Sequence, residues 1–341
     1  MNRYYLIIIS LLSVTSTFAQ VDSADYFFQK GLKEKELGRK LEVWKNMDKA
    51  YHYAPDNTQV VSELAAILLD LRKYGQAKEM YQKLESLGIT SADNYRQLMT
   101  LSFNMKQHDD VIHYATKLKQ VDKTAKVSYM MGKSYYNQEN YGDGIKHLEA
   151  AQKEEPDNAE IPYLIGRSYA DMFNYKQSLP YYIKAITLNP AKSDWTYELG
   201  MIYYAMGDNA NSLKYMLLAR EKGYKKSNDY QYNLGIAYLN TGNLTEGLKI
   251  FTELLKKRPS DLNILNIVAE SYYFAGKYQE AMDYWDKMLE YDMKNASALY
   301  MIGMCYQKKG EKDKGVALCD KAIEMDPSLA NLKQKKQMMG M

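Results

Sequence analysis

The chain has 341 residues, of which 46% are hydrophobic and 26% charged, a composition typical of a soluble folded protein rather than of a disordered or membrane-embedded one. Its 45 Lys and Arg against 42 Asp and Glu give a net charge of +3, so no overall basic field is available to hold nucleic acid or an anionic membrane. Two Cys and four His leave little material for a protein with several metal sites.

The first twenty residues have the features of an export signal. Arg3 is followed by an apolar run from Leu6 to Leu12 and then by small and polar residues that end in Thr17-Phe18-Ala19. This order predicts a signal peptide over residues 1–19 with cleavage after Ala19. An uncleaved anchor is the alternative, but the run is far shorter than the ~20 apolar residues of a spanning helix. We therefore expect a mature protein in an oxidising compartment, periplasmic or associated with the cell envelope.

Sliding the chain against itself reveals a repeat of about 34 residues. The segments Gly31–Asn57, Gly132–Asn158 and Gly166–Pro190 align from a Gly to a Pro 24 residues later. Extending this register over residues 24–328 predicts nine repeats, with steps of 33 to 35 residues. The repeats start at Ala24, Thr58, Ala92, Ala125, Ala159, Ser193, Asn228, Leu262 and Ala296.

Positions within a repeat are numbered as slots from its first residue. Slot 8 is Gly or Ala in every repeat except the third, which has Met99, and slot 20 is small or β-branched throughout. Apolar residues at slots 4, 7, 8 and 11 and at slots 20, 24 and 27 follow helical spacing in two segments. Gly at slot 15 and Pro at slot 32, each in five repeats, end the two helices. Each repeat is therefore a predicted pair of closely approaching helices, which must stack on its neighbours to bury its apolar face.

This pattern resembles the tetratricopeptide repeat family, whose fingerprint includes Leu-Gly at slots 7 and 8, Tyr at slot 11 and Pro at slot 32. Leu199-Gly200 with Tyr203, and Leu234-Gly235 with Tyr238, carry it clearly, while the second and third repeats lack both the Tyr and the Pro. The resemblance implies an all-α fold, an α-solenoid that winds as a right-handed superhelix of about nine helix-turn-helix repeats.

Two features depart from the regular repeat. Pro180 lies at slot 22, inside the expected second helix of the fifth repeat, and is expected either to delay the start of that helix or to bend it locally. Residues 329–341 follow the last repeat and are predicted to form a capping helix and tail, with Lys333, Lys335 and Lys336 on a polar face.

The resemblance also implies that the first helix of each repeat lines a concave face through slots 2, 5, 9, 12 and 13. Tyr recurs at slots 5 and 12, and a large rigid ring with a hydroxyl suits recognition of an extended peptide or a helix. Packing within the chain is the alternative, because aromatic stripes at helical spacing often belong to a core. The predicted partner-binding groove comprises Tyr129, Lys133, Tyr136, Tyr163, Arg167, Tyr197, Tyr204, Tyr232, Tyr273 and Tyr300.

Charged residues on these slots predict a basic spot followed by an acidic edge, which would orient a partner segment with an acidic end. Ordinary solvated charge is the alternative. The pairing of Lys at slot 5 with Asn at slot 9, which holds chaperone tails in some family members, is absent. The basic residues are Arg96, Lys126, Lys133 and Arg167, and the acidic ones are Asp194 and Asp229.

Sequence motifs of enzymes are absent: the chain has no H-E-x-x-H, no G-x-S-x-G and no phosphate-binding glycine loop. His108 and His113 are five residues apart, which splits them between helix faces, and a zinc site needs three or four converging ligands. Cys305 and Cys319 are predicted to face the interior of the ninth repeat, as two thiols or as a disulfide. We therefore expect no catalytic residue, no metal and no cofactor.

These observations favour a non-enzymatic, exported scaffold that binds another protein or a peptide segment along its concave face, as an adaptor or assembly factor of a bacterial cell envelope. The alternative is a carbohydrate-contacting component of polysaccharide export or cell-wall assembly, because Tyr rings stack on sugars. No nucleic acid partner and no transmembrane segment in the mature chain are expected. The identity of the partner, the oligomeric state and association with an envelope complex stay open.

Overall fold

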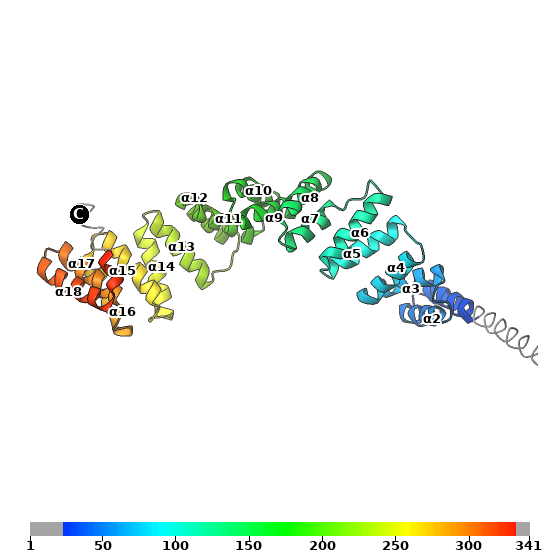
Figure 1. Cartoon of the computed structure of the whole chain (residues 1–341), viewed down its shortest axis with the longest axis horizontal. Coiled ribbons are helices and arrows are strands. Elements are labelled where there is room, and N and C mark those ends of the chain that lie inside the picture. The colour runs from blue at the N-terminus through cyan, green and yellow to red at the C-terminus, as the bar shows by residue number, and fades with distance from the viewer. Residues whose placement is uncertain (1–22, 332–341) are drawn as a thin grey trace, which may run out of the picture. The chain divides into compact units, whose positions relative to one another are not determined.

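A computed structural model of the chain describes residues 23–331, which form helices joined by short turns, with no strand among them (Figure 1). The predicted signal peptide over residues 1–19 lies outside the described residues. Of the predicted cap over residues 329–341, only the first three residues are described, at the end of a short 3₁₀ helix and the turn of helix that follows it.

The described residues form a succession of helix pairs, beginning with the helix over residues 23–36 and its partner α2. The further bounds are α2 (Lys40–Tyr53), α3 (Thr58–Asp70), α4 (Tyr74–Ser86), α5 (Ala92–Asn104), α6 (His108–Val121), α7 (Ser128–Asn137), α8 (Tyr141–Glu154), α9 (Glu160–Asp171), α10 (Tyr175–Leu188), α11 (Ser193–Ala205), α12 (Asn209–Glu221), α13 (Asn228–Asn240), α14 (Leu244–Lys257), α15 (Leu262–Phe274), α16 (Tyr278–Tyr291), α17 (Ala296–Lys308), α18 (Lys312–Met325) and the 3₁₀ helix η1 (Pro327–Leu329).

Contacts between helices divide the chain into an N-terminal body, Met1–Leu188, and a C-terminal body, Asn189–Met341. Within each body, the second helix of a repeat packs on its own first helix and on the first helix of the next repeat. The predicted all-α solenoid fold is therefore confirmed. A first helix is in turn contacted by its own second helix and, within a body, by the second helix of the preceding repeat.

Close contact at slots 8 and 20 joins the two helices of a repeat. A Cβ atom added to Gly166 would lie 2.8 Å from Cδ2 of Tyr182, and one added to Gly303 would lie 2.7 Å from the carbonyl oxygen of Gly315. Side chains do not pack this tightly, so glycine is needed at both positions. The predicted close approach is confirmed, and the large side chain at slot 24, such as Tyr182, fills the space beside it.

The third repeat reaches the same packing by an exchange of residues. It has Met99 at slot 8 and Ala115 at slot 24, whereas the other repeats place the small residue at slot 8. Met99 is 3% exposed and Ala115 is fully buried, and both belong to the core of the N-terminal body. The total side-chain volume at the crossing is thus kept, which cores tolerate well.

Slot 15 has a left-handed backbone in every repeat. Five repeats use Gly there, with φ between +69° and +96°, as at Gly207. The other four use residues that adopt this conformation at a cost of roughly 1 kcal/mol each. These residues are Arg72, Lys106, Glu139 and Phe173, with φ between +58° and +61°. The turn between the paired helices therefore imposes a left-handed backbone at slot 15, whichever side chain stands there.

Pro180 lies inside α10, which begins at Tyr175. The expectation that Pro180 delays the start of this helix is therefore wrong. Proline lacks an N–H, so the carbonyl of Lys176 loses its usual helical partner. Because Lys176 lies at the exposed surface, water can take that hydrogen bond and the helix continues.

The left-handed turn predicts that Phe173→Gly stabilises the protein, because glycine adopts positive φ freely and the Phe173 side chain is 78% exposed. We expect the free energy of unfolding to rise by about 0.5–1 kcal/mol in chemical denaturation. As the matched reverse change, Gly207→Ala is expected to lower it by about 1 kcal/mol. Destabilisation by Phe173→Gly would contradict the left-handed turn.

The helix contact predicts that Gly200→Leu lowers the free energy of unfolding by about 1–3 kcal/mol through overpacking. A Cβ atom at Gly200 would already lie 3.2 Å from both Cγ and the backbone nitrogen of Met216. Gly75→Leu on α4 is the matched control, because a Cβ there meets no atom within 4 Å. Equal melting temperatures for the two variants would rule out the close contact at slot 8.

Candidate partner-binding face

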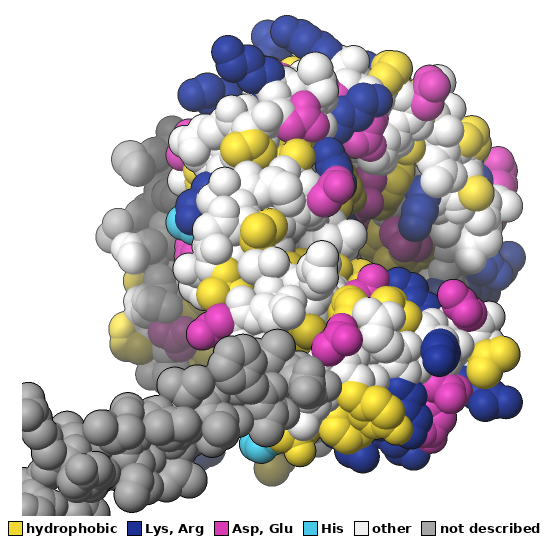
Figure 2. Space-filling model, turned by 90° about the vertical axis from the view of Figure 1, so that its right-hand side faces the viewer, with side chains coloured by type: hydrophobic (Ala, Val, Ile, Leu, Met, Phe, Trp, Pro, Cys, Tyr) yellow, Lys and Arg dark blue, Asp and Glu magenta, His cyan; other side chains and the backbone are white. Residues whose placement is uncertain are grey.

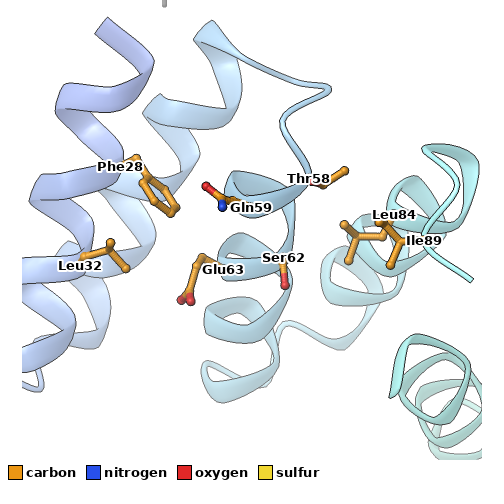
Figure 3. A pocket seen from close by; sticks show the side chains of 8 residues that line it. All are labelled: Phe28, Leu32, Thr58, Gln59, Ser62, Glu63, Leu84 and Ile89. Carbon is orange, nitrogen blue, oxygen red and sulfur yellow. The ribbon is translucent and has the colours of Figure 1, made fainter. Parts of the chain in front are cut away.

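The side of the first helices that carries slots 2, 5, 6, 9, 12 and 13 is here called the first-helix face. In the N-terminal body, it includes an open pocket of about 490 Å³. Phe28 and Leu32 point from the helix over residues 23–36 toward α3, where Glu63 faces them, and Leu84 and Ile89 lie on the other side of α3 (Figure 3). The pocket thus combines apolar walls with the carboxylate of Glu63. Lys35 forms an ion pair with this carboxylate at 2.5 Å.

Tyr129 and Lys133 on α7 share the carboxylate of Glu160 on α9. The Tyr129 hydroxyl donates to Oε2 at 2.8 Å, and Nζ of Lys133 donates to Oε1 at 2.8 Å. Nζ also lies 5.6 Å from the ring centroids of Phe103 and Tyr129, close enough for a cation–π contact. This cluster links the first helices of three successive repeats, so two of the predicted groove residues are brought together.

The pKa values around this cluster keep its side chains in their ordinary protonation states near neutral pH. Burial, and then the hydrogen bond to Glu160, raise the pKa of Tyr129 to about 12. For Lys133, burial lowers the pKa, but the hydrogen bonds to Glu160 and Tyr129 outweigh this and the net pKa is raised. Burial also raises the pKa of Tyr136, although Arg167 opposes it. Neutral tyrosines and a charged lysine near pH 7 are not poised to transfer protons.

Cations of the predicted basic spot have partners inside the N-terminal body. Arg96 pairs with Asp93 at 2.7 Å and with Asp122 at 3.3 Å, in addition to the Lys133 pair with Glu160. Nζ of Lys126 donates a hydrogen bond to the carbonyl oxygen of Glu154 at 3.2 Å, and Arg167 donates one to the Tyr163 hydroxyl at 2.8 Å. These contacts favour the alternative of ordinary surface charge. Charges of both signs are likewise interspersed on the face shown in Figure 2.

Several slot-5 tyrosines pack mainly against their own repeats. Tyr163 meets the slot-24 ring of Tyr182 edge-on at 5.6 Å, and Tyr232 meets Phe251 in the same way at 5.6 Å. Tyr163 is 8% exposed and Tyr300 is 5% exposed, so they offer a partner almost no surface. At these slots, packing within the chain accounts for the Tyr stripe.

One end of the first-helix face in the C-terminal body is aromatic and acidic. Tyr197 on α11 stacks on Tyr224 with ring centroids 4.4 Å apart and accepts a 2.7 Å hydrogen bond from Asn233 on α13. Burial, the neighbouring Tyr197 and then the carboxylates of Asp194, Glu198 and Asp229 raise the pKa of Tyr224. The acidic edge expected from the sequence therefore surrounds an aromatic pair.

The other end of this face is an apolar groove of about 530 Å³ between α13 and α15. Ile236, Leu239, Ile267 and Phe274 line it, and Phe274 is 82% exposed. Tyr273 is half-buried and packs on Phe274, Tyr278 and Trp285. Tyr204, at slot 12 of α11, is 41% exposed.

Sequence reasoning singled out tyrosines and missed the residues that line the grooves. Phe28 and Phe274 occupy face slots, but as isolated phenylalanines they belong to no stripe. Tyr224 and Ile89 both occupy slot 32, where Pro was expected, and each follows a Gly with φ +90°. A Gly at slot 31 followed by an apolar residue is the signal that could have found them.

Among residues 23–331, no three His, Cys, Asp or Glu side chains converge as metal ligands. None of the helices described there has the length and apolar character needed to cross a bilayer. Cys305 and Cys319 are buried thiols, and burial raises the pKa of Cys305 to about 12, which disfavours the reactive thiolate.

Comparison with protein families identifies the repeat. Two family profiles, both described as tetratricopeptide repeat, match the chain, one over residues 159–192 and 296–329 and the other over residues 129–171 and 204–261. The protein belongs to the tetratricopeptide repeat family. Proteins built from this repeat are typically non-catalytic scaffolds.

Solved structures share the fold at low sequence identity. The C-terminal part of a tetratricopeptide repeat protein from Cytophaga hutchinsonii is 17% identical with a TM-score of 0.55, over 70% of this chain and 98% of that one. YrrB, a tetratricopeptide repeat protein with an unusual peptide-binding site, is 20% identical with a TM-score of 0.44, over 55% of this chain and 97% of that one. The first comparison concerns the fold alone.

Human protein O-mannosyl-transferase TMTC2 is 29% identical over 100 residues. The match covers 28% of this tetratricopeptide repeat protein but 12% of the transferase. The chain thus matches a small part of that relative's length, and the match carries no transferase activity over to it.

The raised pKa of Tyr129 predicts a specific loss of stability in alkali. The folded protein keeps this hydroxyl neutral up to about pH 12, while the unfolded chain ionises it near pH 10. The stabilisation is therefore complete below pH 10 and is lost as the pH rises toward 12. In urea unfolding at about pH 9 and pH 11, Tyr129→Phe is expected to lose less stability than the wild type. An equal loss would contradict the burial of this hydroxyl.

Proposed function

We propose that the protein is a non-enzymatic scaffold that binds another protein or a peptide segment along its first-helix faces. The observation that carries the proposal is the exposure of large apolar side chains at open grooves of this face, above all Phe274, which is 82% exposed beside the groove between α13 and α15. Apolar patches rimmed by polar groups mark interaction sites in soluble proteins. The repeat family, whose members serve as interaction scaffolds, supports the same role.

We further propose that residues 1–19 are a cleaved signal peptide and that the mature protein acts in the bacterial cell envelope as an adaptor or assembly factor. The basic start, apolar run and small-x-small site of the sequence support export. Mass spectrometry of the protein recovered from an envelope fraction is expected to find Gln20 as the first residue. Retention of the apolar run in that protein would contradict cleavage.

Crosslinking in living cells tests the binding face. A photoreactive amino acid replaces either Ser62 or Tyr204, which lie exposed on the first-helix faces of the two bodies. Exposed residues of second helices, Lys184 on α10 and Lys249 on α14, are the matched controls in the same bodies. We expect a discrete crosslinked polypeptide from at least one face position and none from its control. Identical products from face and control positions, or none from either face, would overturn the proposal.

A further inference from the structure

We infer that the first-helix face of the C-terminal body binds a cationic, amphipathic segment of a partner polypeptide. The segment places Lys or Arg side chains beside Tyr197 and Tyr224 and apolar side chains in the groove beside Phe274. This inference rests on the proposed function, because it names the chemistry of the partner that one of the two faces takes.

Over the sixth to eighth repeats, the charged residues on the slots of this face have one sign. In the sixth to eighth repeats, face slots carry four carboxylates and neither Lys nor Arg. These carboxylates are Asp194, Glu198, Asp229 and Glu270. The N-terminal body differs, because its face slots carry cations as well, and Lys133 and Arg96 pair there with Glu160 and Asp93. A one-signed face around apolar side chains selects a partner segment of the opposite charge.

The acidic end is built to hold a cation. Asp194 and Asp229 are exposed on the first turns of α11 and α13, and within residues 23–331 neither forms an ion pair. Between these helices lies the stack of Tyr197 on Tyr224, which is only half-buried. Lysine and arginine side chains bind such a site in two ways, by attraction to the carboxylates and by contact with the aromatic faces.

The apolar end offers the anchor for a large side chain. Phe274 and Ile267 from α15 face Ile236 and Leu239 from α13 across the groove of about 530 Å³. Glu270 stands on the wall of this groove and accepts a 3.0 Å hydrogen bond from Asn266. A buried apolar anchor surrounded by polar groups is the arrangement that supplies most of the binding energy at protein interfaces.

Helix α13 joins the two ends. Asp229 lies on its first turn and Leu239 on its last, which at 1.5 Å per residue places them about 15 Å apart along the helix axis. A bound helix of about ten residues spans this distance. The segment is therefore short, and its charged and apolar residues are separated along its length. An anionic membrane surface is disfavoured as the occupant because the carboxylates would repel it.

Fluorescence anisotropy with three labelled peptides tests the inference on the full-length protein. The Leu–Lys peptide has 14 residues, with Lys concentrated at one end and a stripe of Leu at the other. The Leu–Glu peptide replaces each Lys with Glu, and the Ser–Lys peptide replaces each Leu with Ser. We expect the Leu–Lys peptide to bind at least about tenfold more tightly than either of the other two, and to weaken as salt is added.

Variants then test how much each end of the face contributes to binding. Phe274→Ala is expected to weaken Leu–Lys binding about tenfold, because Phe274 anchors the apolar stripe. Asp194→Asn with Asp229→Asn is expected to weaken it about fivefold and to flatten its salt dependence. Phe173→Ala removes an equally exposed ring, 78% against 82%, from the other body and is expected to leave binding unchanged. All of these side chains are exposed, so folding is preserved.

Equal binding of the Leu–Lys and Leu–Glu peptides, or unchanged binding after the Asp194 and Asp229 substitutions, would overturn the charge selection. Unchanged binding after Phe274→Ala would overturn the groove. Tight binding of the Leu–Glu peptide alone would overturn the inference while leaving the proposed scaffold function intact. The crosslinking experiment decides that function separately, because it uses the cell's own partner and both bodies.

Discussion

The close contact of two helices within each repeat is the constraint on which the rest of the structure depends. Gly303 and Gly315 bring the two backbones of the last repeat so near that a Cβ atom on Gly303 would lie 2.7 Å from a carbonyl oxygen of the other helix. Held there and against the neighbouring repeat, each first helix keeps a fixed orientation and presents slots 2, 5, 6, 9, 12 and 13 on one side. The candidate binding surface is therefore a consequence of the packing.

Much of the fold could be predicted from the sequence because helix packing repeats with the chain. A 34-residue period, small residues at slot 8 and stop residues at slots 15 and 32 predict paired helices. Local exceptions could not be predicted, since packing and turn geometry outweigh local preference. Met99 and Ala115 exchange roles across one contact, and Phe173 adopts a left-handed turn that glycine occupies elsewhere. Pro180 lies within a helix that it was expected to shorten.

The candidate site was harder to predict because one residue type has two roles. Tyr at slot 5 packs against slot 24 in Tyr163 and Tyr232, while Tyr197 stacks on Tyr224 and stays half-exposed. Sequence spacing does not separate these roles, because the role depends on a neighbour outside the helix. For Tyr197, that neighbour is Tyr224 in the loop between α12 and α13. The acidic edge could be read from the sequence, whereas the apolar groove depends on which side chains α13 and α15 leave uncovered.

The claim that partners bind to first helices, and not to second helices, is tested most directly by mapping the contact from the ligand. A benzophenone side chain at the centre of the Leu–Lys peptide, activated by light in the complex, labels the residues that it touches, and mass spectrometry identifies them. The account predicts labels on α13 and α15, around Ile236, Leu239, Ile267 and Phe274. Labels concentrated on α14 and α16 would contradict it.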